Sequence, residues 1–409
     1  MGLTMSLAGC GGASTPDLSG GTVITPTPTP TPAPSASPSP EPEISLGVQA
    51  TPVATINAPW SLTFLPSGDA LVGQRIYGGG AISLVTQTGE VSKLQADIPA
   101  PNNGVLDVAL DPDYAANHRI FFTFIEVDPA APRIGRPQDA PNENPEGTAV
   151  ASATLALDGR GGGRLSDIQV IWRQLPKITT PEISGNFGAK LAFSPDGQYL
   201  FVSNGDRQEL VSGLIVSMAT TIGKVVRIRP DGTIPSDNPF YGQPGVAPEI
   251  WTMGHRNPYG LAFDLLGNLW ENENGPMGGD ELNLLLPSSN YGWPLVSNGD
   301  DYDGRVIPDH STGDGFEAPR VSWTPVIAPS DMLFYHGTSF RSWQGDALLT
   351  GLKAEAIVRV RITGGSAREV QRIAMGARIR SIAEAPDGAL WVLEDAPSAR
   401  LLRLTPVKL

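Results

Sequence analysis

One short phrase recurs along the chain and constrains the fold more than any other feature of the sequence. Each copy places two apolar runs on either side of a turn, and in three of the six copies this turn is built from proline, a small or acidic polar residue and glycine. Proline fixes the backbone angle early in such a turn, and glycine accepts the positive φ that follows. Each copy is therefore predicted to be an antiparallel hairpin with the same register. The copies are Phe64–Val72, Leu110–Phe122, Phe193–Val202, Phe263–Trp270, the degraded Phe340–Leu349, and Ala385–Val392.

The spacing of the copies predicts the architecture. Residues 50–409 comprise 360 residues, which gives 60 residues for each of the six copies. A blade of four short strands with its turns needs about 40 residues, so the remainder is expected to form loops. Such a repeat is typical of an all-β, six-bladed β-propeller with four-stranded antiparallel blades and long loops on one face. A β-sandwich is the alternative, but it does not explain six similar hairpins.

The N-terminal segment differs in composition from the repeats. Leu7–Gly12 resembles the lipobox of bacterial lipoproteins, in which Cys10 would carry the lipid, although no Lys or Arg precedes it and the apolar stretch is short. Residues 11–49 are rich in Pro, Thr and Ser, which favours an extended spacer. We expect a partial lipoprotein-like signal segment at 1–10, a linker at 11–49 and a propeller domain at 50–409. The protein is then predicted to be periplasmic or otherwise extracytoplasmic and lipid-anchored. A chance match followed by a tail without a role is the alternative.

Charge and composition exclude several classes of partner. The formal net charge of −14 opposes binding of nucleic acid, whose phosphates require positive surfaces. No run approaches the ~20 apolar residues of a membrane-spanning helix, so contact with a membrane is expected only through Cys10. The single cysteine allows no internal disulfide. Small ligands and metal ions are the partners that remain.

Cationic side chains gather near the predicted strand ends of this acidic chain. If the blades form a ring, these positions converge, and guanidinium groups bind carboxylates through paired hydrogen bonds. The pattern predicts a site for an anionic ligand. The alternative is that each cation is simply a solvated strand end. The cations are Lys190, Arg256, Lys353, Arg378 and Arg380.

Longer phrases of the chain resemble one known family, the soluble pyrroloquinoline quinone (PQQ)-dependent sugar dehydrogenases of the glucose/sorbosone dehydrogenase family. The resemblance covers roughly residues 55–405. It is carried by LDVALDPDY, FGAKLAFSPDG, GKVVRIRPDGTIPSDNPF, PEIWTMGHRNPYGLAFD, GGDELNLL with NYGWP, and RIRSIAEAPDG. The resemblance implies a six-bladed propeller that oxidises an aldose sugar, with hydride passing from the sugar C1 to PQQ and electrons passing to an external acceptor.

The resemblance also assigns cofactor positions. PQQ is a tricarboxylate, so it requires a set of cations such as the one noted above. The backbone carbonyls of Gly275 and Pro276 would help to hold a Ca²⁺ ion, for which hard oxygen ligands are suited. The acidic loop Asp300–Gly304 is predicted either to bind a second, structural Ca²⁺ or to be an ordinary solvated loop. The positions implied to contact PQQ are Arg256, Asn257, Lys353, Arg378 and Arg380.

Two positions depart from the family pattern. The family has a histidine general base where this chain has Asn186, with Asp206 in the supporting position, and a sugar-binding glutamine where this chain has Asn102. Asn186 cannot accept a proton at neutral pH, and none of the four histidines occupies its place. Loss of general-base assistance typically costs about 10²–10⁴-fold in rate. His255 is expected to orient or pack neighbouring groups rather than to replace the base.

Three interpretations stay open. The protein is a PQQ- and Ca²⁺-dependent dehydrogenase with a changed substrate or base, in which Asp206 acts directly; or it is a catalytically weak PQQ- or sugar-binding propeller; or it is a non-enzymatic scaffold. A scaffold has no physical need for a tricarboxylate pocket, so the retained cations favour the first two. The absent histidine favours weak catalysis. The sequence as a whole predicts a PQQ-dependent sugar dehydrogenase.

Overall fold

The structure is a computed structural model that describes residues 46–76, 79–98, 104–132, 144–179, 185–208 and 213–408. Cys10 and Asn102 lie outside the described residues, so the expectations placed on them stay predictions. Within those ranges the only helices are α1 (Tyr114–Asn117) and the 3-10 helix η1 (Arg341–Trp343). No helix of the described part is long and apolar enough to cross a membrane.

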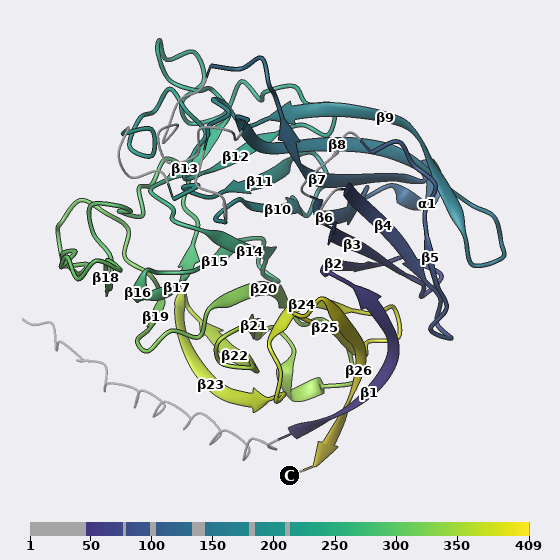
Figure 1. The fold of residues 1–409 in the computed structure, drawn as a ribbon. Helices are drawn as coiled ribbons and strands as arrows, with labels where there is room; N and C mark the ends of the chain where they lie inside the picture. Colours follow the sequence, from purple (N-terminus) through teal and green to yellow (C-terminus); the bar gives the residue numbers. More distant parts are fainter. Residues whose placement is uncertain are drawn as a thin grey trace, which may run out of the picture. The chain divides into compact units, whose positions relative to one another are not determined.

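Six four-stranded antiparallel sheets follow one another around a ring, so the predicted six-bladed β-propeller is confirmed (Figure 1). Blade 1 contains β2 (Pro59–Phe64), β3 (Ala70–Ile76), β4 (Gly79–Val85) and β5 (Val91–Lys93). Blade 2 contains β6 (Val105–Leu110), β7 (Arg119–Val127), β8 (Glu146–Leu157) and β9 (Gly163–Arg173). Blade 3 contains β10 (Gly188–Phe193), β11 (Leu200–Asn204), β12 (Lys224–Ile228) and β13 (Ile250–Met253).

The remaining blades follow the same order, with the first strand of each nearest the axis. Blade 4 contains β14 (Pro258–Phe263), β15 (Leu269–Glu273), β17 (Asp280–Leu284) and β19 (Val321–Trp323). Blade 5 contains β20 (Pro329–Phe334), β21 (Ala347–Gly351), β22 (Ala356–Thr363) and β23 (Ser366–Ala374). Blade 6 contains β24 (Ile379–Glu384), β25 (Leu390–Glu394), β26 (Ser398–Lys408) and β1 (Leu46–Asn57). A small extra sheet pairs β16 (Met277–Gly278) with β18 (Gly299–Asp300).

Blade 6 closes the ring because it joins the two ends of the described chain. Its outermost strand is β1, which pairs antiparallel with β26 from Leu46↔Lys408 to Asn57↔Ser398. β1 begins at Leu46, inside the range expected to be linker. This pairing ties the first strand to the last three, so the ring cannot open without breaking a long ladder of hydrogen bonds.

The repeated phrase forms the turn between the first and second strand of each blade. In four blades the turn glycine has a positive φ, 89° at Gly68, 70° at Gly197, 82° at Gly267 and 78° at Gly388. The predicted hairpins are therefore confirmed in these four blades, and their turns lie at the ends of the inner strands. We call this end of the ring the turn face. In blade 2 the turn is longer because it contains α1. In blade 5 the predicted hairpin Phe340–Leu349 is wrong, because Arg341–Trp343 form η1 and the hairpin joins β20 to β21.

The opposite ends of the inner strands share a second feature that the sequence did not reveal. Near its start, each inner strand shifts register against the second strand of its blade, as at Pro59/Ser61, Val105/Asp107 and Ile379/Ser381. Such a β-bulge re-aims the extra side chain and bends the strand. We call this end of the ring the bulge face. The residues inside the six irregularities are Trp60, Leu106, Ala189 with Lys190, Tyr259, Ser330 with Asp331, and Arg380.

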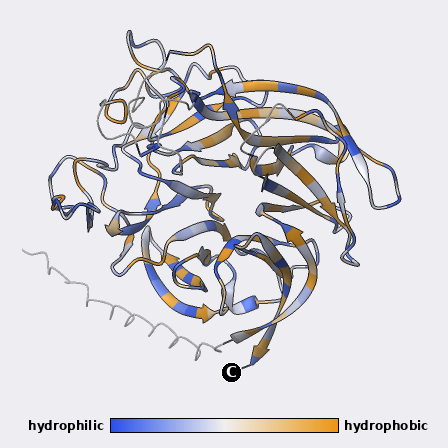
Figure 2. Ribbon diagram, in the orientation of Figure 1, coloured by the Kyte–Doolittle hydropathy of each residue, from blue (hydrophilic) through white to orange (hydrophobic). Residues whose placement is uncertain are grey.

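Apolar side chains pack between neighbouring blades and hold the ring rigid. Both faces of a blade are apolar: Leu71 of β3 packs with residues of blade 2, and Val72, the next residue, packs with residues of blade 6. Figure 2 shows hydrophobic residues along the strands of every blade. Phe64 of blade 1 meets Trp391 of blade 6 with ring centroids 5.3 Å apart, and Phe121 meets Phe193 at 5.1 Å between blades 2 and 3. Full burial of such a side chain contributes about 1.5–3 kcal/mol.

Candidate functional site

Asn186 and Asp206 lie next to each other at the bulge face. Asn186 precedes β10 and has a φ of 54°, in the left-handed region that asparagine tolerates better than most residues. Its Nδ2 donates to Asp206 Oδ1 at 2.8 Å. Trp293 Nε1 donates to the other carboxylate oxygen at 2.9 Å, and the Gln208 amide donates to Oδ1 at 2.8 Å. Three donors thus fix the carboxylate of Asp206, and one of them is the side-chain amide nitrogen of Asn186.

Burial raises the pKa of Asp206 above its ordinary value, against the opposing positive charge of Arg256. The carboxylate is almost completely shielded, since only 1% of the residue is exposed. Asn186 is buried as well, with 7% of the residue exposed, so both members of the pair are shielded from solvent. A direct role for Asp206 in removing a proton would require the substrate to reach a shielded carboxylate.

Arg256 and Asn257 occupy the connection between β13 and β14. Glu273 on β15 accepts hydrogen bonds from both of their backbone amides, with 3.1 Å for Asn257. The side chain of Asn257 donates to Asn274 Oδ1 at 2.9 Å. Arg256 Nη1 donates to the Gly275 carbonyl at 2.8 Å. These bonds place an arginine and an amide over the loop that follows β15.

His255 lies one residue earlier and is completely buried. Its Nε2 is 2.8 Å from Thr252 Oγ1, its Nδ1 is 3.3 Å from Glu273 Oε1, and its ring stacks on Tyr291. Burial alone would lower the pKa of His255, but hydrogen bonds with Glu271 and Glu273 outweigh it and raise the pKa to about 9. The histidine thus supports Glu273, which holds Arg256 and Asn257. This agrees with the orienting role predicted for it.

Asp280 ties the Gly275 loop to a second loop of the site. Its Oδ1 accepts from the Gly275 amide at 2.9 Å, and its Oδ2 accepts from Ile327 and Ala328 at 2.7 Å each. The Ile327 carbonyl in turn accepts from the backbone amide of Lys353 at 3.0 Å. One buried carboxylate therefore connects the predicted Ca²⁺ loop with the predicted PQQ-binding lysine. The Lys353 side chain itself is exposed and forms no ion pair with any described residue.

Arg378 and Arg380 flank the first residue of β24 and share one carboxylate. Asp395 pairs with Arg378 Nη2 at 2.7 Å through one oxygen and with Arg380 Nη2 at 2.7 Å through the other. Burial alone would raise the pKa of Asp395, but the two arginines outweigh it and hold the pKa below its usual range. Arg378 stays 48% exposed, whereas Arg380 is only 8% exposed. Arg380 is therefore the fixed cation of the pair.

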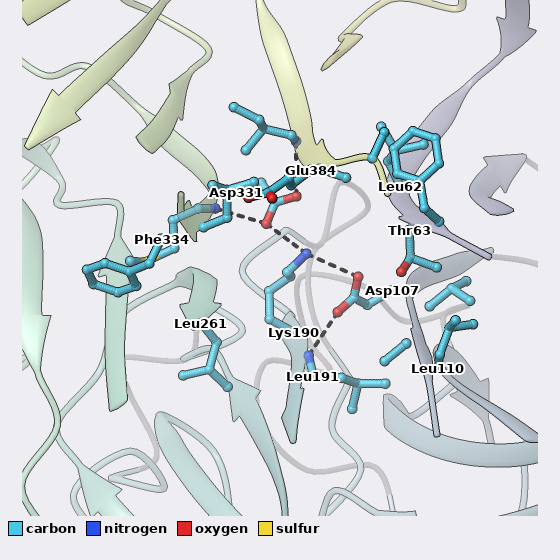
Figure 3. A pocket seen from close by; sticks show the side chains of 18 of the residues that line it. Leu62, Thr63, Asp107, Leu110, Lys190, Leu191, Leu261, Asp331, Phe334 and Glu384 are labelled. Carbon is cyan, nitrogen blue, oxygen red and sulfur yellow. Dashed lines mark hydrogen bonds and ion pairs between the residues drawn. The ribbon is translucent and has the colours of Figure 1, made fainter. Parts of the chain in front are cut away.

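Lys190 does not belong to this group of cations. Figure 3 shows its ammonium between two carboxylates, 3.1 Å from Asp107 Oδ1 and 2.8 Å from Asp331 Oδ1. Burial alone would lower the pKa of Lys190, but the two aspartates raise it and keep the side chain charged. Lys190 lines a cavity of about 580 Å³ that extends toward the turn face. Its placement in an anion-binding site was wrong, because its charge is already neutralised by two other blades.

The acidic loop Asp300–Gly304 uses its carboxylates internally. Asp301 pairs with Arg305, and Asp303 Oδ1 accepts from the Arg305 amide at 2.8 Å. The Gly304 amide closes a turn on the Asp301 carbonyl at 3.0 Å. This arrangement favours the ordinary loop over a second Ca²⁺ site. Tyr302 reaches from the loop to within 5.6 Å of the Arg256 guanidinium carbon.

Residues 56–403 match the family model described as Glucose / Sorbosone dehydrogenase. The chain belongs to this family. The aldose sugar dehydrogenase YliI of Escherichia coli is 34% identical over 370 residues, which cover 86% of this chain and 91% of that protein. Quinoprotein glucose dehydrogenase B of Acinetobacter calcoaceticus is 25% identical over 426 residues, which cover 84% of each.

Solved structures of related enzymes agree with this assignment. The soluble aldose sugar dehydrogenase from Escherichia coli in its apo-form matches with a TM-score of 0.77 and 33% identity, over 88% of this chain and 100% of that one. The PQQ-bound aldose sugar dehydrogenase from Streptomyces coelicolor matches with a TM-score of 0.67 and 26% identity, over 90% of this chain and 100% of that one. The resemblance found in the sequence is confirmed, and these relatives support an oxidoreductase of the sugar dehydrogenase type.

Sequence reasoning missed several residues of this sugar dehydrogenase family member at the bulge face. Trp60 and Tyr259 reach each other from opposite blades, with ring centroids 6.1 Å apart. Arg75, at the end of β3, has its guanidinium carbon 4.9 Å from the Trp60 ring. A signal was available, because Pro59–Phe64 and Pro258–Phe263 share the pattern Pro, aromatic, any residue, Leu, any residue, Phe.

Proposed function

We propose that the protein is a PQQ- and Ca²⁺-dependent aldose sugar dehydrogenase that passes electrons to an external acceptor. The observation that carries the proposal is a group of cations gathered at the bulge face of an acidic chain. Lys353 is exposed and pairs with no carboxylate of the described residues, and Arg378 and Arg380 share the single carboxylate of Asp395. PQQ is a tricarboxylate, and cations placed in this way are the groups that bind carboxylates.

Two buried polar atoms support the fit of PQQ to these residues. Arg256 Nε and Asn257 Oδ1 are buried without a hydrogen-bond partner among the described residues. A buried polar group left unsatisfied costs about 1–3 kcal/mol, so such atoms are normally partnered. Both belong to residues that the resemblance assigns to PQQ. A ligand that offers an acceptor to Arg256 and a donor to Asn257 would satisfy them.

The Gly275–Pro276 carbonyls are the proposed protein ligands of Ca²⁺. A carbonyl oxygen has two lone pairs, so Gly275 can accept from Arg256 and still contact an ion. Two carbonyls are fewer than the 6–8 oxygens that Ca²⁺ prefers, so the cofactor and water would have to supply the others. Metal and cofactor are therefore expected to bind together.

PQQ, when bound, supplies the acceptor for the hydride of the sugar C1. Arg378, Arg380 and Lys353 would bind its carboxylates, and Arg256 with Asn257 would orient it over the Gly275 loop. Asn186 Nδ2 donates a hydrogen bond to Asp206, so the Oδ1 atom of Asn186 is the acceptor proposed for a sugar hydroxyl. This oxygen orients the hydroxyl but does not take its proton. The proton would pass to solvent, and turnover would be slow.

The runner-up function is a PQQ- or sugar-binding protein that turns over little or not at all. Asn186 is the observation that favours it, because an amide is not a general base and Asp206 is shielded from solvent. Asn102 is proposed to contact the sugar in either case. A non-enzymatic scaffold is disfavoured, since it has no need for the unsatisfied Arg256 and Asn257 atoms.

We also propose that the protein lies in the periplasm or another extracytoplasmic space and is anchored by lipid on Cys10. Its support is the lipobox-like Leu7–Gly12 followed by a proline-rich spacer. Expression in a bacterium with labelled palmitate would label the wild-type protein and leave a Cys10→Ala variant unlabelled. An equal signal from both proteins would rule out the anchor.

The test of the proposed function is a titration of apo-protein with PQQ at about 1 mM Ca²⁺, at the upper end of the range in which extracellular sites bind this ion, followed by tryptophan fluorescence. Reduction of a dye is then measured with a panel of aldoses. Saturable, Ca²⁺-dependent binding with dye reduction supports the dehydrogenase. Binding without reduction supports the runner-up, and no binding rejects the PQQ site.

A further inference from the structure

Trp60 lies in the bulge of β2 and contacts two arginines at once. The guanidinium carbon of Arg380 is 3.9 Å from its ring centroid, and that of Arg75 is 4.9 Å away. A guanidinium over an indole face is attracted by the negative face of the ring, most strongly where water is excluded. Arg380 is buried, so its contact with Trp60 belongs to the stronger class.

The contact series continues from Trp60 toward Asn186. Arg75 also lies 5.7 Å from the Phe187 ring, and Arg207 lies 3.5 Å from the same ring. Phe187 follows Asn186 in the chain, and Arg207 follows Asp206. Cations and aromatic rings therefore alternate from the proposed cofactor arginine to the proposed catalytic pair.

Tyr259 holds Trp60 from the opposite side of the ring of blades. Blades 1 and 4 face each other across the axis, and the two aromatic rings meet edge to face with an interplanar angle of 80°. Trp60 is thus fixed by a contact that spans the propeller. The indole cannot turn away from Arg380 without losing this contact.

Trp60 contacts two arginines that repel each other, Arg75 and Arg380. Burial together with this repulsion lowers the pKa of Arg75. Among the described residues Arg380 has one carboxylate partner, Asp395, which it shares with Arg378. The indole supplies a further attraction to Arg380 without adding a negative charge that would repel an anionic ligand. A cation held in place beforehand costs less to order on binding.

We propose that Trp60 is a positioning residue of the anion site, which holds the guanidinium of Arg380 ready for a carboxylate of the ligand. This inference rests on the proposed function for the identity of the ligand, but not for the contact itself. It assigns a role to a residue outside the set that the family resemblance supplied.

Binding measurements on four variants test the proposal. Trp60→Leu is expected to weaken PQQ binding about tenfold, as loss of a desolvated cation–π contact predicts. It should leave binding of the uncharged PQQ trimethyl ester unchanged. In an Arg380→Met background Trp60→Leu should add little, because coupled residues are not additive. Trp391→Leu is the matched control, a buried tryptophan of blade 6 that packs on Phe64, and it should lose stability without losing affinity.

A spectroscopic signature separates failure of this inference from failure of the proposed function. In apo-protein carrying ¹⁵N-arginine, the Arg380 Nε–H resonance can be identified because it is lost in Arg380→Lys. The ring current of the Trp60 indole should shift this resonance upfield. In Trp60→Leu the resonance should return to the usual chemical shift of an arginine Nε–H. If the wild-type resonance shows no such upfield shift, the proposal is overturned, whether or not the protein binds PQQ. Equal weakening of PQQ and its trimethyl ester, or a full effect of Trp60→Leu in the Arg380→Met background, would also overturn it. If the wild-type protein does not bind PQQ, benzene-1,2,4-tricarboxylate replaces it as the probe.

Discussion

The two faces of the propeller are built from opposite ends of the same six strands, yet they follow different rules. At the turn face four of the six blades repeat one solution, a tight turn in which Gly68, Gly197, Gly267 and Gly388 take positive φ. At the bulge face every blade has the same backbone irregularity but a different side chain. These side chains include an indole, a phenol, an ammonium, a carboxylate and a guanidinium.

The difference has a physical origin. A turn is a local problem of backbone geometry, so each blade can solve it alone and in the same way. A ligand site on the axis is assembled from several blades, so its members must differ to complement one molecule. Substitutions at the turn face should therefore change stability, and substitutions at the bulge face should change binding or turnover.

The largest effect is expected from Asn186→His at the bulge face. One ring nitrogen of a histidine there could accept a hydrogen bond from a sugar hydroxyl, while the other ring nitrogen donates to Asp206. This arrangement would restore general-base assistance. We expect the rate of aldose oxidation by PQQ-loaded protein to rise by about 10²–10⁴-fold, measured as dye reduction. Asn186→Gln is the control, because it keeps the amide and should bring no gain. An unchanged rate in Asn186→His would show that the site is no longer arranged for this chemistry.

A comparison of two carboxylates sharpens the contrast between the faces. Asp280 at the bulge face accepts from Gly275, Ile327 and Ala328. Asp280→Asn turns one acceptor into a donor that faces backbone N–H groups, so the Ca²⁺ loop should loosen. We expect the Ca²⁺ concentration needed for PQQ binding to rise about 10–100-fold, as for other residues that support metal ligands.

Asp264→Asn is the matched change at the turn face. Asp264 accepts from the Leu266 and Asn268 amides and from Trp270 Nε1, at 2.9–3.0 Å. Its loss should lower the free energy of unfolding in urea by about 1–3 kcal/mol and leave the Ca²⁺ requirement unchanged. If Asp264→Asn and Asp280→Asn raised the Ca²⁺ concentration needed for PQQ binding equally, the two faces would not differ in function.

The turn face was predictable from the sequence, whereas much of the bulge face was not. The turns require particular residues at adjacent positions, so the hairpins and the blade number could be read from the repeated phrase. Arg380 was found because the family phrase contains it. Lys190 was misplaced because its partners, Asp107 and Asp331, come from other blades. Trp60 was missed because the alternation along a strand does not show where a bulge re-aims a side chain, and the pattern that Pro59–Phe64 shares with Pro258–Phe263 was not used.

A pH titration of stability should reveal another charge buried near the bulge face. Lys224 begins β12 and donates to the carbonyls of Ile215 and Ile222, and burial lowers its pKa to about 7. Between about pH 7 and 10.5 the unfolded chain then binds the proton that the folded protein has released, so stability rises with pH. We expect a gain of about 2–5 kcal/mol across this window in urea unfolding.

Lys224→Met is the control for this titration. Methionine has a similar length and no charge, so the variant should lose most of the rise between pH 7 and 10.5. A rise of the same size in the variant would assign the pH dependence to other groups.

The smallest effect is expected from one glycine of the turn face, compared with one of the bulge face. Gly267 has a φ of 82°, and an added Cβ would meet only Pro195 Cγ at 4.0 Å, so Gly267→Ala costs backbone strain alone. We expect the free energy of unfolding in urea to fall by about 1–2 kcal/mol and the PQQ affinity to stay unchanged.

At Gly275 an added Cβ would collide with the carbonyl oxygens of Gly278 and Gly279, so Gly275→Ala must shift the predicted Ca²⁺ loop. It should weaken PQQ binding at a given Ca²⁺ concentration even where its stability loss matches that of Gly267→Ala. If both variants bind PQQ as the wild-type protein does, the Gly275 loop is not part of the site.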